Sequence, residues 1–270
     1  MMVVDRVIES IGAQPMNDVS LSQGCWLVRG KECADFDVKS GGSASVLLVD
    51  DKSIGSLCVD VDVERNATIN IVQVVTEGYD HEVELVVAEG ATVNMTQLVL
   101  APAKVKTTCY LKGANARFEL RGSFVACDDD KCDVAVNVLH EVGDCVSRTT
   151  YKGVASGIAK GSFSSLVYIK EDAQRTDAEQ LSRNVTIGDA VINTSPQMEI
   201  YADDVRCSHG ATVGQMDADA IMYMRQRGLS AADAKRLQIE GFVADTVMHS
   251  AIDGCGEAMM ELLFEKLNRL

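Results

Sequence analysis

Aromatic residues and prolines are scarce in this sequence. Only 5% of its 270 residues are Phe, Trp or Tyr, and it contains three prolines and one tryptophan, Trp26. Enzymes that act on polysaccharides line a groove with aromatic and acidic side chains, so a β-helix enzyme of that kind is a weak alternative here. Valine, alanine, threonine and glycine dominate instead, which favours short buried strands joined by turns of small residues.

Positive charge is also in short supply. Acidic residues outnumber basic ones by 40 to 25, which gives a formal net charge of −15. A field of that sign repels phosphate backbones and anionic membrane surfaces, so neither nucleic acid nor a membrane is expected as a partner. The same charge suits a protein partner with a basic surface.

Long apolar segments are absent. Asp5 and Arg6 interrupt the N-terminal segment before it could form the apolar core of a signal peptide. No window approaches the roughly 18 apolar residues of a membrane span. We therefore expect a cytoplasmic protein.

The short motifs of common catalytic sites are missing too. The sequence has no G-x-x-x-x-G-K-[ST], no G-x-G-x-x-G after a strand, no H-E-x-x-H and no G-x-S-x-G. Nucleotide hydrolysis, hydride transfer, zinc proteolysis and esterase chemistry are thus unsupported. We expect that the chain is not an enzyme by itself and binds no nucleotide.

Cysteine, in contrast, is frequent. The nine cysteines form no C-x-x-C pair and their number is odd, so the sequence carries neither a disulfide framework nor a zinc ribbon. In a reducing compartment most of them are expected to be small buried side chains, with ligation of a soft metal as the alternative. Cys127 and Cys132 are interpreted as the strand ends of a solvated hairpin, and a metal site there would need Cys145 as a further ligand.

The pattern from about residue 19 to residue 213 is that of strands. Between Leu57 and Glu64 apolar and acidic residues alternate without error, which gives a strand one dry face and one wet face. The segment ATINIVQVV at 67–75 recurs as ATVNMTQLV at 91–99, and a weaker copy begins at Gly113. Such a period without room for crossover helices predicts the coils of a parallel β-solenoid. Asn70 and Asn94 could stack between coils or be ordinary exposed polar residues.

The periodicity changes to that of helices after Gly214. Gly228 ends a first helix, Ser230 and Asp233 resemble a capping box, and Glu257 to Leu270 form a last amphipathic helix. The middle helix carries an apolar stripe formed by Ala234, Leu237, Ile239, Phe242, Val243 and Val247. We predict a short N-terminal helix at 1–18, a β-helix core at 19–216 and a helical segment at 217–270 that caps the solenoid.

One pair of residues could carry metal chemistry. Cys207 and His209 are two residues apart on a predicted strand, so their side chains leave it on the same face. A thiolate beside an imidazole can ligate iron, zinc or copper(I), and it also resembles a nucleophile and its base. The structural alternative is a hydrogen-bonded histidine at a strand end, in a turn at His209-Gly-Ala, beside a packed cysteine.

The segment around this pair resembles the SufB/SufD family of iron–sulfur cluster assembly scaffolds. Residues 194–214, TSPQMEIYADDVRCSHGATVG, are similar to the SufD pattern P-x-L-E-I-x-A-D-D-V-x-C-x-H-G-A-T-V-G, and YMRQRG at 223–228 is similar to F-Y-x-x-x-R-G. His140 and residues 173–184 also fit the family's pattern.

This resemblance implies a fold and a role. Family members are right-handed parallel β-helices that pair with one another and dock the ABC-type ATPase SufC through their C-terminal helices. A transient iron–sulfur cluster is built between the paired subunits. The resemblance assigns His209 to that interface, with Cys207 as its neighbour and second candidate ligand for iron or the cluster.

Three departures from the family pattern matter, and the first two favour SufD over SufB. SufB members carry a glutamate where this sequence has Gly210, and a cysteine near the positions of Ser182 and Arg183. The N-terminal region is also shorter than in typical members. The partner is therefore expected to be a SufB-like subunit or, in a minimal system, a second copy of this chain. A structural solenoid without metal remains the alternative function.

Overall fold

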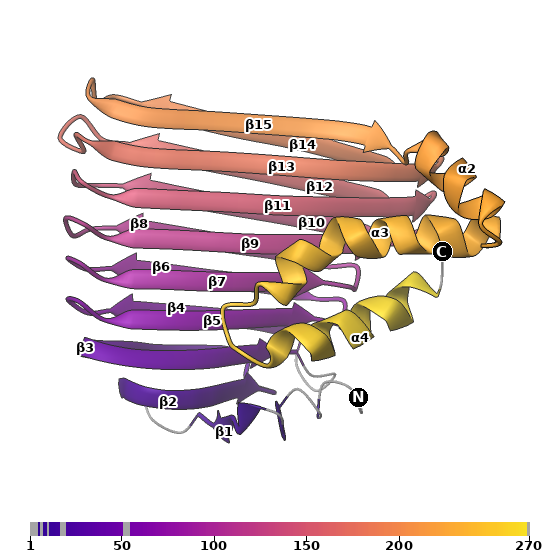
Figure 1. Ribbon diagram of the computed structural model, residues 1–270. Coiled ribbons are helices and arrows are strands. Elements are labelled where there is room, and N and C mark those ends of the chain that lie inside the picture. The colour runs from indigo at the N-terminus through magenta and orange to yellow at the C-terminus, as the bar shows by residue number, and fades with distance from the viewer. Residues whose placement is uncertain (1–4, 6–7, 10, 17–19, 51–54, 269–270) are drawn as a thin grey trace.

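Strands follow one another along the chain and stack into the coils of a β-solenoid (Figure 1). The computed structural model describes residues 5, 8–9, 11–16, 20–50 and 55–268. Half of the predicted N-terminal helix at 1–18 lies outside the described residues; of those described, residues 5, 8, 9 and 11 are helical, and Gln14–Pro15 form a short strand. The strands are β1 (Gln14–Pro15), β2 (Ser20–Arg29), β3 (Cys33–Val49), β4 (Ser56–Val63), β5 (Thr68–Val75), β6 (Asp80–Val87), β7 (Thr92–Val99), β8 (Lys104–Leu111), β9 (Arg117–Ala126), β10 (Lys131–His140), β11 (Val146–Gly157), β12 (Lys160–Ile169), β13 (Thr176–Gly188), β14 (Val191–Ile200) and β15 (Val205–Gln215).

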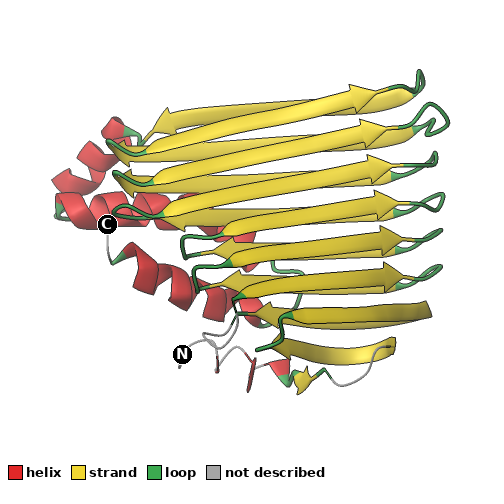
Figure 2. Ribbon diagram, turned by 180° about the vertical axis from the view of Figure 1, so that it is seen from behind, coloured by secondary structure: helices red, strands yellow, loops and turns green. Residues whose placement is uncertain are grey.

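Each coil contributes one strand to each of two faces. The even strands β4 to β14 pair in parallel on one face, and the odd strands β5 to β15 pair in parallel on the other (Figure 2). The long strand β3 joins the faces, because its first half pairs with β4 and its second half with β5. The predicted parallel β-solenoid is confirmed.

The sequence repeat sets the register between coils. Ile69 pairs with Val93 and Ile71 with Met95 across β5 and β7, as the repeat predicts. Asn94 Nδ2 donates to Asn70 Oδ1 at 2.9 Å, so these two asparagines do form a ladder between coils. In-register stacking therefore extends from the backbone to the side chains.

The coils lengthen along the solenoid. Thr68 pairs with Thr92, a step of 24 residues, whereas Val146 pairs with Asp177, a step of 31. This lengthening explains why the repeat is clear only in the first copies. The turns stack as well: Gly90 has a φ of +68°, and a Cβ there would lie 2.3 Å from the side-chain oxygen of Asn66 in the preceding coil.

Alternate side chains fill the lumen. Leu57, Val59, Val61 and Val63 are each at most 2% exposed, and the acidic residues between them face outward. The pattern of dry and wet faces predicted for this segment is confirmed. Polar side chains also lie inside the lumen of the first coils, where Gln97 Nε2 donates to Gln73 Oε1 at 2.7 Å and both residues are buried.

Three helices follow the last strand: α2 (Ala218–Gln226), α3 (Ala231–Met248) and α4 (Cys255–Leu267). Their presence confirms the predicted helical segment, and Ser230 caps α3 by accepting from the backbone N–H of Asp233. The expectation that they cap the solenoid was wrong. α3 and α4 lie against the outer face of the odd strands (Figure 1), where they form a second hydrophobic core. That core contains Leu47, Val72, Leu98, Val125, Val154, Ile239, Val243, Val247, Met259, Leu263 and Leu267.

Other local predictions also need correction. Leu237 is 49% exposed, because α3 turns only part of the predicted stripe toward the strands. Cys127 and Cys132 are fully buried, and β9 and β10 do not pair, so the segment between them is a turn within a coil and not a hairpin. His209 and Gly210 lie inside β15 and not in a turn.

Two lysines link the helices to the β-solenoid through ion pairs. Lys266 of α4 lies 2.5 Å from Asp130, and both side chains are less than 10% exposed. Lys152 of β11 donates to the carbonyl of Phe242 at 2.7 Å and pairs with Asp245 of α3. None of the described helices is long and apolar enough to cross a bilayer.

We predict that Lys266→Met lowers the free energy of unfolding by roughly 3 kcal/mol, because it leaves the Asp130 carboxylate buried without its cation. Urea unfolding followed by circular dichroism measures this. The control is Lys170→Met, which removes a partly exposed pair with Glu141 and should cost less than about 1 kcal/mol. Equal losses in the two variants would contradict the anchoring role of Lys266.

Candidate functional site at the open end of the solenoid

The C-terminal end of the solenoid carries two strands with free edges. Within the described chain, β14 pairs only with β12 and β15 only with β13. The helices lie on the flank, so they leave this end uncovered (Figure 1). The backbone groups along the outer edges of both strands are therefore available to another chain.

Cys207 and His209 lie on β15 and face the lumen side at this end. Their register partners on β13 are Ala178 and Gln180, which are both buried in the lumen. The predicted common face is thus observed. His209 is exposed because no coil follows above it, whereas Cys207 is half-buried and packs against the core.

The Cys207 thiol is held in its neutral form. Burial raises its pKa above the usual value, the Ala178 backbone hydrogen bond partly offsets that rise, and Asp177 adds to it. A metal ligand must be the thiolate, so a cation close to Cys207 would have to bring the pKa back down.

The lumen beneath His209 is polar. Its column runs from Leu120 in β9 through Thr149 in β11 to Gln180 in β13, so apolar side chains give way to polar ones toward the open end. Ser165 donates to Gln180 Oε1, and Gln180 Nε2 donates to the carbonyl of Gln197 at 2.9 Å. His209 therefore stands above a hydrogen-bonded polar layer and not above a sealed apolar core.

A second polar cluster lies beside this layer. Asn184 Nδ2 lies 2.9 Å from Ser182 Oγ and 3.1 Å from the carbonyl of Thr212, and Thr194 Oγ1 lies 3.2 Å from Ser182 Oγ. The Asn184 Oδ1 atom is buried without a hydrogen-bond partner among the described residues. Sequence reasoning missed these residues, although the inward positions Gln180, Ser182 and Asn184 break the apolar alternation.

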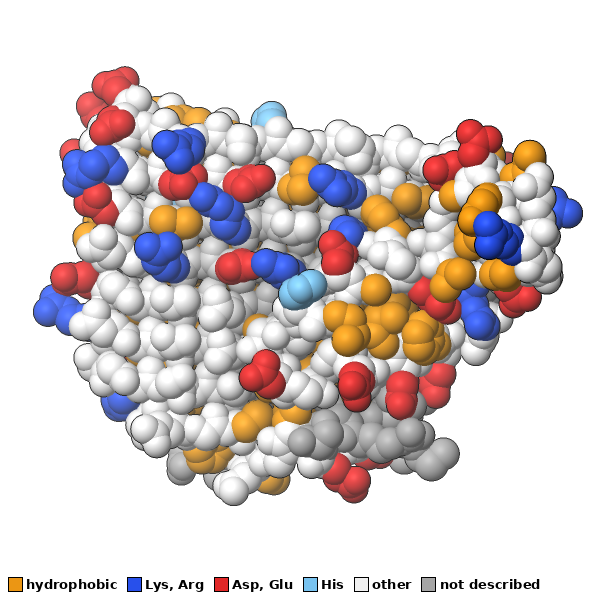
Figure 3. All heavy atoms as spheres, viewed as in Figure 1, with side chains coloured by type: hydrophobic (Ala, Val, Ile, Leu, Met, Phe, Trp, Pro, Cys, Tyr) orange, Lys and Arg blue, Asp and Glu red, His pale blue; other side chains and the backbone are white. Residues whose placement is uncertain are grey.

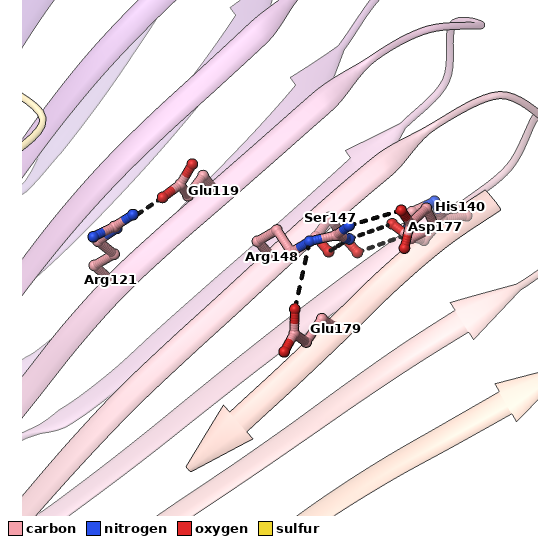
Figure 4. Close-up of polar contacts among 7 residues, drawn as sticks. All are labelled: Glu119, Arg121, His140, Ser147, Arg148, Asp177 and Glu179. Carbon is pink, nitrogen blue, oxygen red and sulfur yellow. Dashed lines mark hydrogen bonds and ion pairs between the residues drawn. The ribbon is translucent and has the colours of Figure 1, made fainter. Parts of the chain in front are cut away.

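His140 lies deeper in the lumen. Its Nε2 is 2.9 Å from Ser147 Oγ, and both residues are at most 1% exposed (Figure 4). Burial lowers the pKa of His140 to about 4, so the imidazole is neutral near pH 7. A hydroxyl beside an imidazole resembles a nucleophile and its base. This pair is buried away from solvent, so we interpret it as a hydrogen bond that stabilises the core.

Charged residues on the outer face of the same coils form ion pairs. Arg148 Nη2 lies 2.7 Å from Asp177 and its Nε lies 3.6 Å from Glu179, while Arg121 lies 2.7 Å from Glu119 (Figure 4). Figure 3 shows both signs of charge interspersed over the last odd strands. This face is therefore balanced in charge.

The other candidate metal ligands do not come together. Cys132 donates to the carbonyl of Ala101 and Cys145 to that of Gly113, and burial raises the pKa of Cys132 to about 12. Among the residues that the structure describes, no three His, Cys, Asp or Glu side chains are placed to hold a metal ion. Met259 is buried as packing, whereas Met222 is exposed on α2.

The family model and the similar proteins that match this chain all point to the same family. The family described as SUF system FeS cluster assembly, SufBD core domain, matches residues 17–242. The chain is 28% identical over 274 residues to the iron–sulfur cluster assembly protein SufD of Escherichia coli, an alignment that covers 94% of this chain and 64% of that protein.

Two other relatives match over shorter regions. Identity is 43% over 118 residues to a SufBD family protein of Synechocystis, which is 43% of this chain and 25% of that protein. It is 31% over 116 residues to SufD of Bacillus subtilis, again 43% of this chain and 26% of that protein. The chain thus spans less than two thirds of the length of these relatives.

The buried His140 predicts a pH dependence of stability. Its pKa is about 4 in the folded chain, below the ordinary value of 6.5, so the unfolded chain binds more protons between these values. The stabilisation is present above pH 6.5 and is lost as the pH falls toward 4, by up to roughly 3 kcal/mol. His140→Asn should remove this part of the pH dependence in urea unfolding from pH 7 to pH 4.5.

The matched control is His249→Asn, the same exchange at an exposed histidine, and the loss of slope in His140→Asn is measured against it. His81, which burial also shifts to a pKa of about 4, keeps part of the slope in His140→Asn. A His140→Asn curve parallel to that of the wild type would show that His140 does not titrate on unfolding.

Proposed function

Because this chain belongs to the SufBD core family of SUF-system iron–sulfur cluster assembly proteins, we propose that it is a SufD-like scaffold subunit that builds a transient cluster at its open end. The observation that carries the proposal is the placement of His209, which is exposed at the end of the solenoid on β15, one of two strands with free edges. The cluster is cargo, and the chain is not proposed to catalyse a reaction alone.

The free edges of β14 and β15 support pairing with another subunit. An uncovered edge strand presents unpaired N–H and C=O groups, and native proteins cover such edges or use them for association. Ile200, Tyr201 and Val213 are exposed at this end, and their burial would add apolar contact to the backbone hydrogen bonds. The proposed partner is a SufB-like subunit or a second copy of this chain.

The number of candidate cluster ligands in this chain also supports pairing with another subunit. Iron–sulfur clusters are held by about four protein ligands. His209 and Cys207 are two, and the described chain offers no third beside them. A partner that faces the same end would supply the rest: a SufB-like subunit from its own residues, or a second copy through its His209 and Cys207.

The helices offer a separate surface for an ATPase of the SufC type. α2 contributes no buried side chain, and its Met222 and Tyr223 are 59% and 57% exposed. Leu237 at the start of α3 is exposed as well, and hydrophobic side chains gather over the helices in Figure 3. α2 begins three residues after the end of β15, so this surface adjoins the proposed pairing edge.

The first test is cluster assembly. His209→Ala and Cys207→Ala in the complete complex should lose most of the iron and acid-labile sulfide gained on anaerobic reconstitution, with melting of the isolated subunit nearly unchanged for His209→Ala. Ser208→Ala, on the opposite face of β15, is the matched control. Normal cluster build-up in His209→Ala, with or without a drop in stability, would contradict the assigned role.

The second test is ATPase docking. Removal of residues 217–270 would expose the second core, so point variants are cleaner. Met222→Ser combined with Tyr223→Ser should weaken binding of a SufC-type ATPase by about tenfold or more, as expected for central apolar contacts. Met248→Ser, at the far end of α3, is the control with a methionine of similar exposure. Unchanged affinity in the double variant would exclude α2 from the docking surface.

A further inference from the structure

Two cysteines lie side by side on the outer face of the first coils. Cys33 opens β3 and Cys58 lies in β4, and the two are direct register partners in adjacent parallel strands. Both thiols are free, Cys33 is exposed and Cys58 is half-buried. In the registers given for the strands, none of the other seven cysteines is paired with a cysteine.

The spacing of this pair fits a disulfide bond. Register partners in neighbouring strands lie about 4.8 Å apart, within the Cα separation of roughly 4.4 to 6.8 Å that disulfides span. The two side chains leave the same face of the sheet, and the Cys33 thiol is near enough to act on the pKa of Cys58. A bond between them would join β3 to β4 without a change of strand register.

The surroundings of the pair are acidic. Asp35, Asp60 and Glu84 stack in register on three successive strands, one column away from the cysteines. Like charges directly opposite one another destabilise a sheet, so this column is not explained by folding. Lys106 is already paired with Glu82 at 2.7 Å, and Lys39 with Asp37 at 2.8 Å. Lys104 lines the same pocket as Cys58, together with Asp80 and Asp133.

This acidity selects the kind of molecule that can react. Burial raises the pKa of Cys58, and Asp60 raises it further, so an anionic thiolate is disfavoured there. The same field repels an anionic reagent and attracts a cationic one. A disulfide between the cysteines carries no charge. It therefore places no negative charge beside the acidic column, as a thiolate would.

We propose that Cys33 and Cys58 form a dithiol site that undergoes thiol–disulfide exchange with small cationic disulfides. Cys33, the exposed thiol, loses its proton and attacks one sulfur of the reagent, which forms a mixed disulfide and releases one reagent thiolate that takes up a proton. Cys58 then loses its proton and attacks the sulfur of Cys33, which releases the second reagent thiol. Two protein thiols are oxidised to one disulfide, and one reagent disulfide is reduced to two thiols.

The experiment uses the full chain, reduced and freed of reductant under anaerobic conditions. It is treated with cystamine, a dicationic disulfide, and in parallel with the anionic 5,5′-dithiobis(2-nitrobenzoate), then alkylated and digested without reduction. A peptide pair linked through Cys33 and Cys58 is the expected main product. Its formation by cystamine should be about tenfold faster at ~10 mM than at ~500 mM salt, and the anionic reagent should show the opposite trend.

Variants identify the order of the two steps. Cys58→Ser should stop at a stable mixed disulfide on Cys33, whereas Cys33→Ser should react slowly at Cys58. Cys25→Ser, which removes another partly exposed thiol, should leave the crosslink unchanged; circular dichroism checks that all variants fold. Persistent mixed disulfides on wild-type Cys33 without the crosslink would overturn the proposal. A crosslink formed at equal rates by both reagents, independent of salt, would overturn the selectivity for cations.

Discussion

The parallel hydrogen-bond ladder between coils is the interaction on which the rest of this structure depends. Each interior strand satisfies its backbone groups on the strands of the preceding and following coils, so no coil can form alone. Because the ladder keeps its register, side chains at equal positions stack into columns along the solenoid. The polarity of the side chains can therefore change stepwise along one column. The column Leu120, Thr149, Gln180 and His209 is an example.

The hydrogen-bond ladder ends at the last coil. At that end this protein has features that a purely structural solenoid does not need. The helices that could have covered the last coil are committed to the flank by the second hydrophobic core and by Lys152 and Lys266. The last coil therefore keeps two free edges, a polar lumen and an exposed imidazole. In the proposed function these three features serve together, because a partner that completes the ladder also closes the lumen over His209.

Much of the architecture was predictable, because the signals for it are local. The alternation at Leu57–Glu64 and the repeat of residues 67–75 predict strands and their stacking, and Ser230 predicts the start of α3. The apolar stripe of α3 shows that one face of the helix is buried, but it does not show which surface covers that face. We therefore expected the helices to cap the solenoid, whereas they pack against the outer face of the odd strands. The pair Cys33 and Cys58 escaped notice because the register between β3 and β4 has no sequence repeat.

The site was predictable in part. The spacing of Cys207 and His209 gives their common face, and the structure places that face over the lumen. The polar layer of Gln180, Ser182 and Asn184 was missed, since inward and outward polar residues look alike until the register of β13 is known. In the proposed function the remaining ligands come from a partner subunit, and the spacing of residues within one chain does not show how two subunits meet.

Hydrogen–deuterium exchange of the chain alone and with its proposed partner tests the central claim most directly. If the open end is the pairing surface, backbone amides in β14 and β15 should exchange more slowly in the complex, while those in the interior strand β7 should not change. Slowed exchange confined to the helices or to the outer face of the even strands, with β14 and β15 unaffected, would contradict the account.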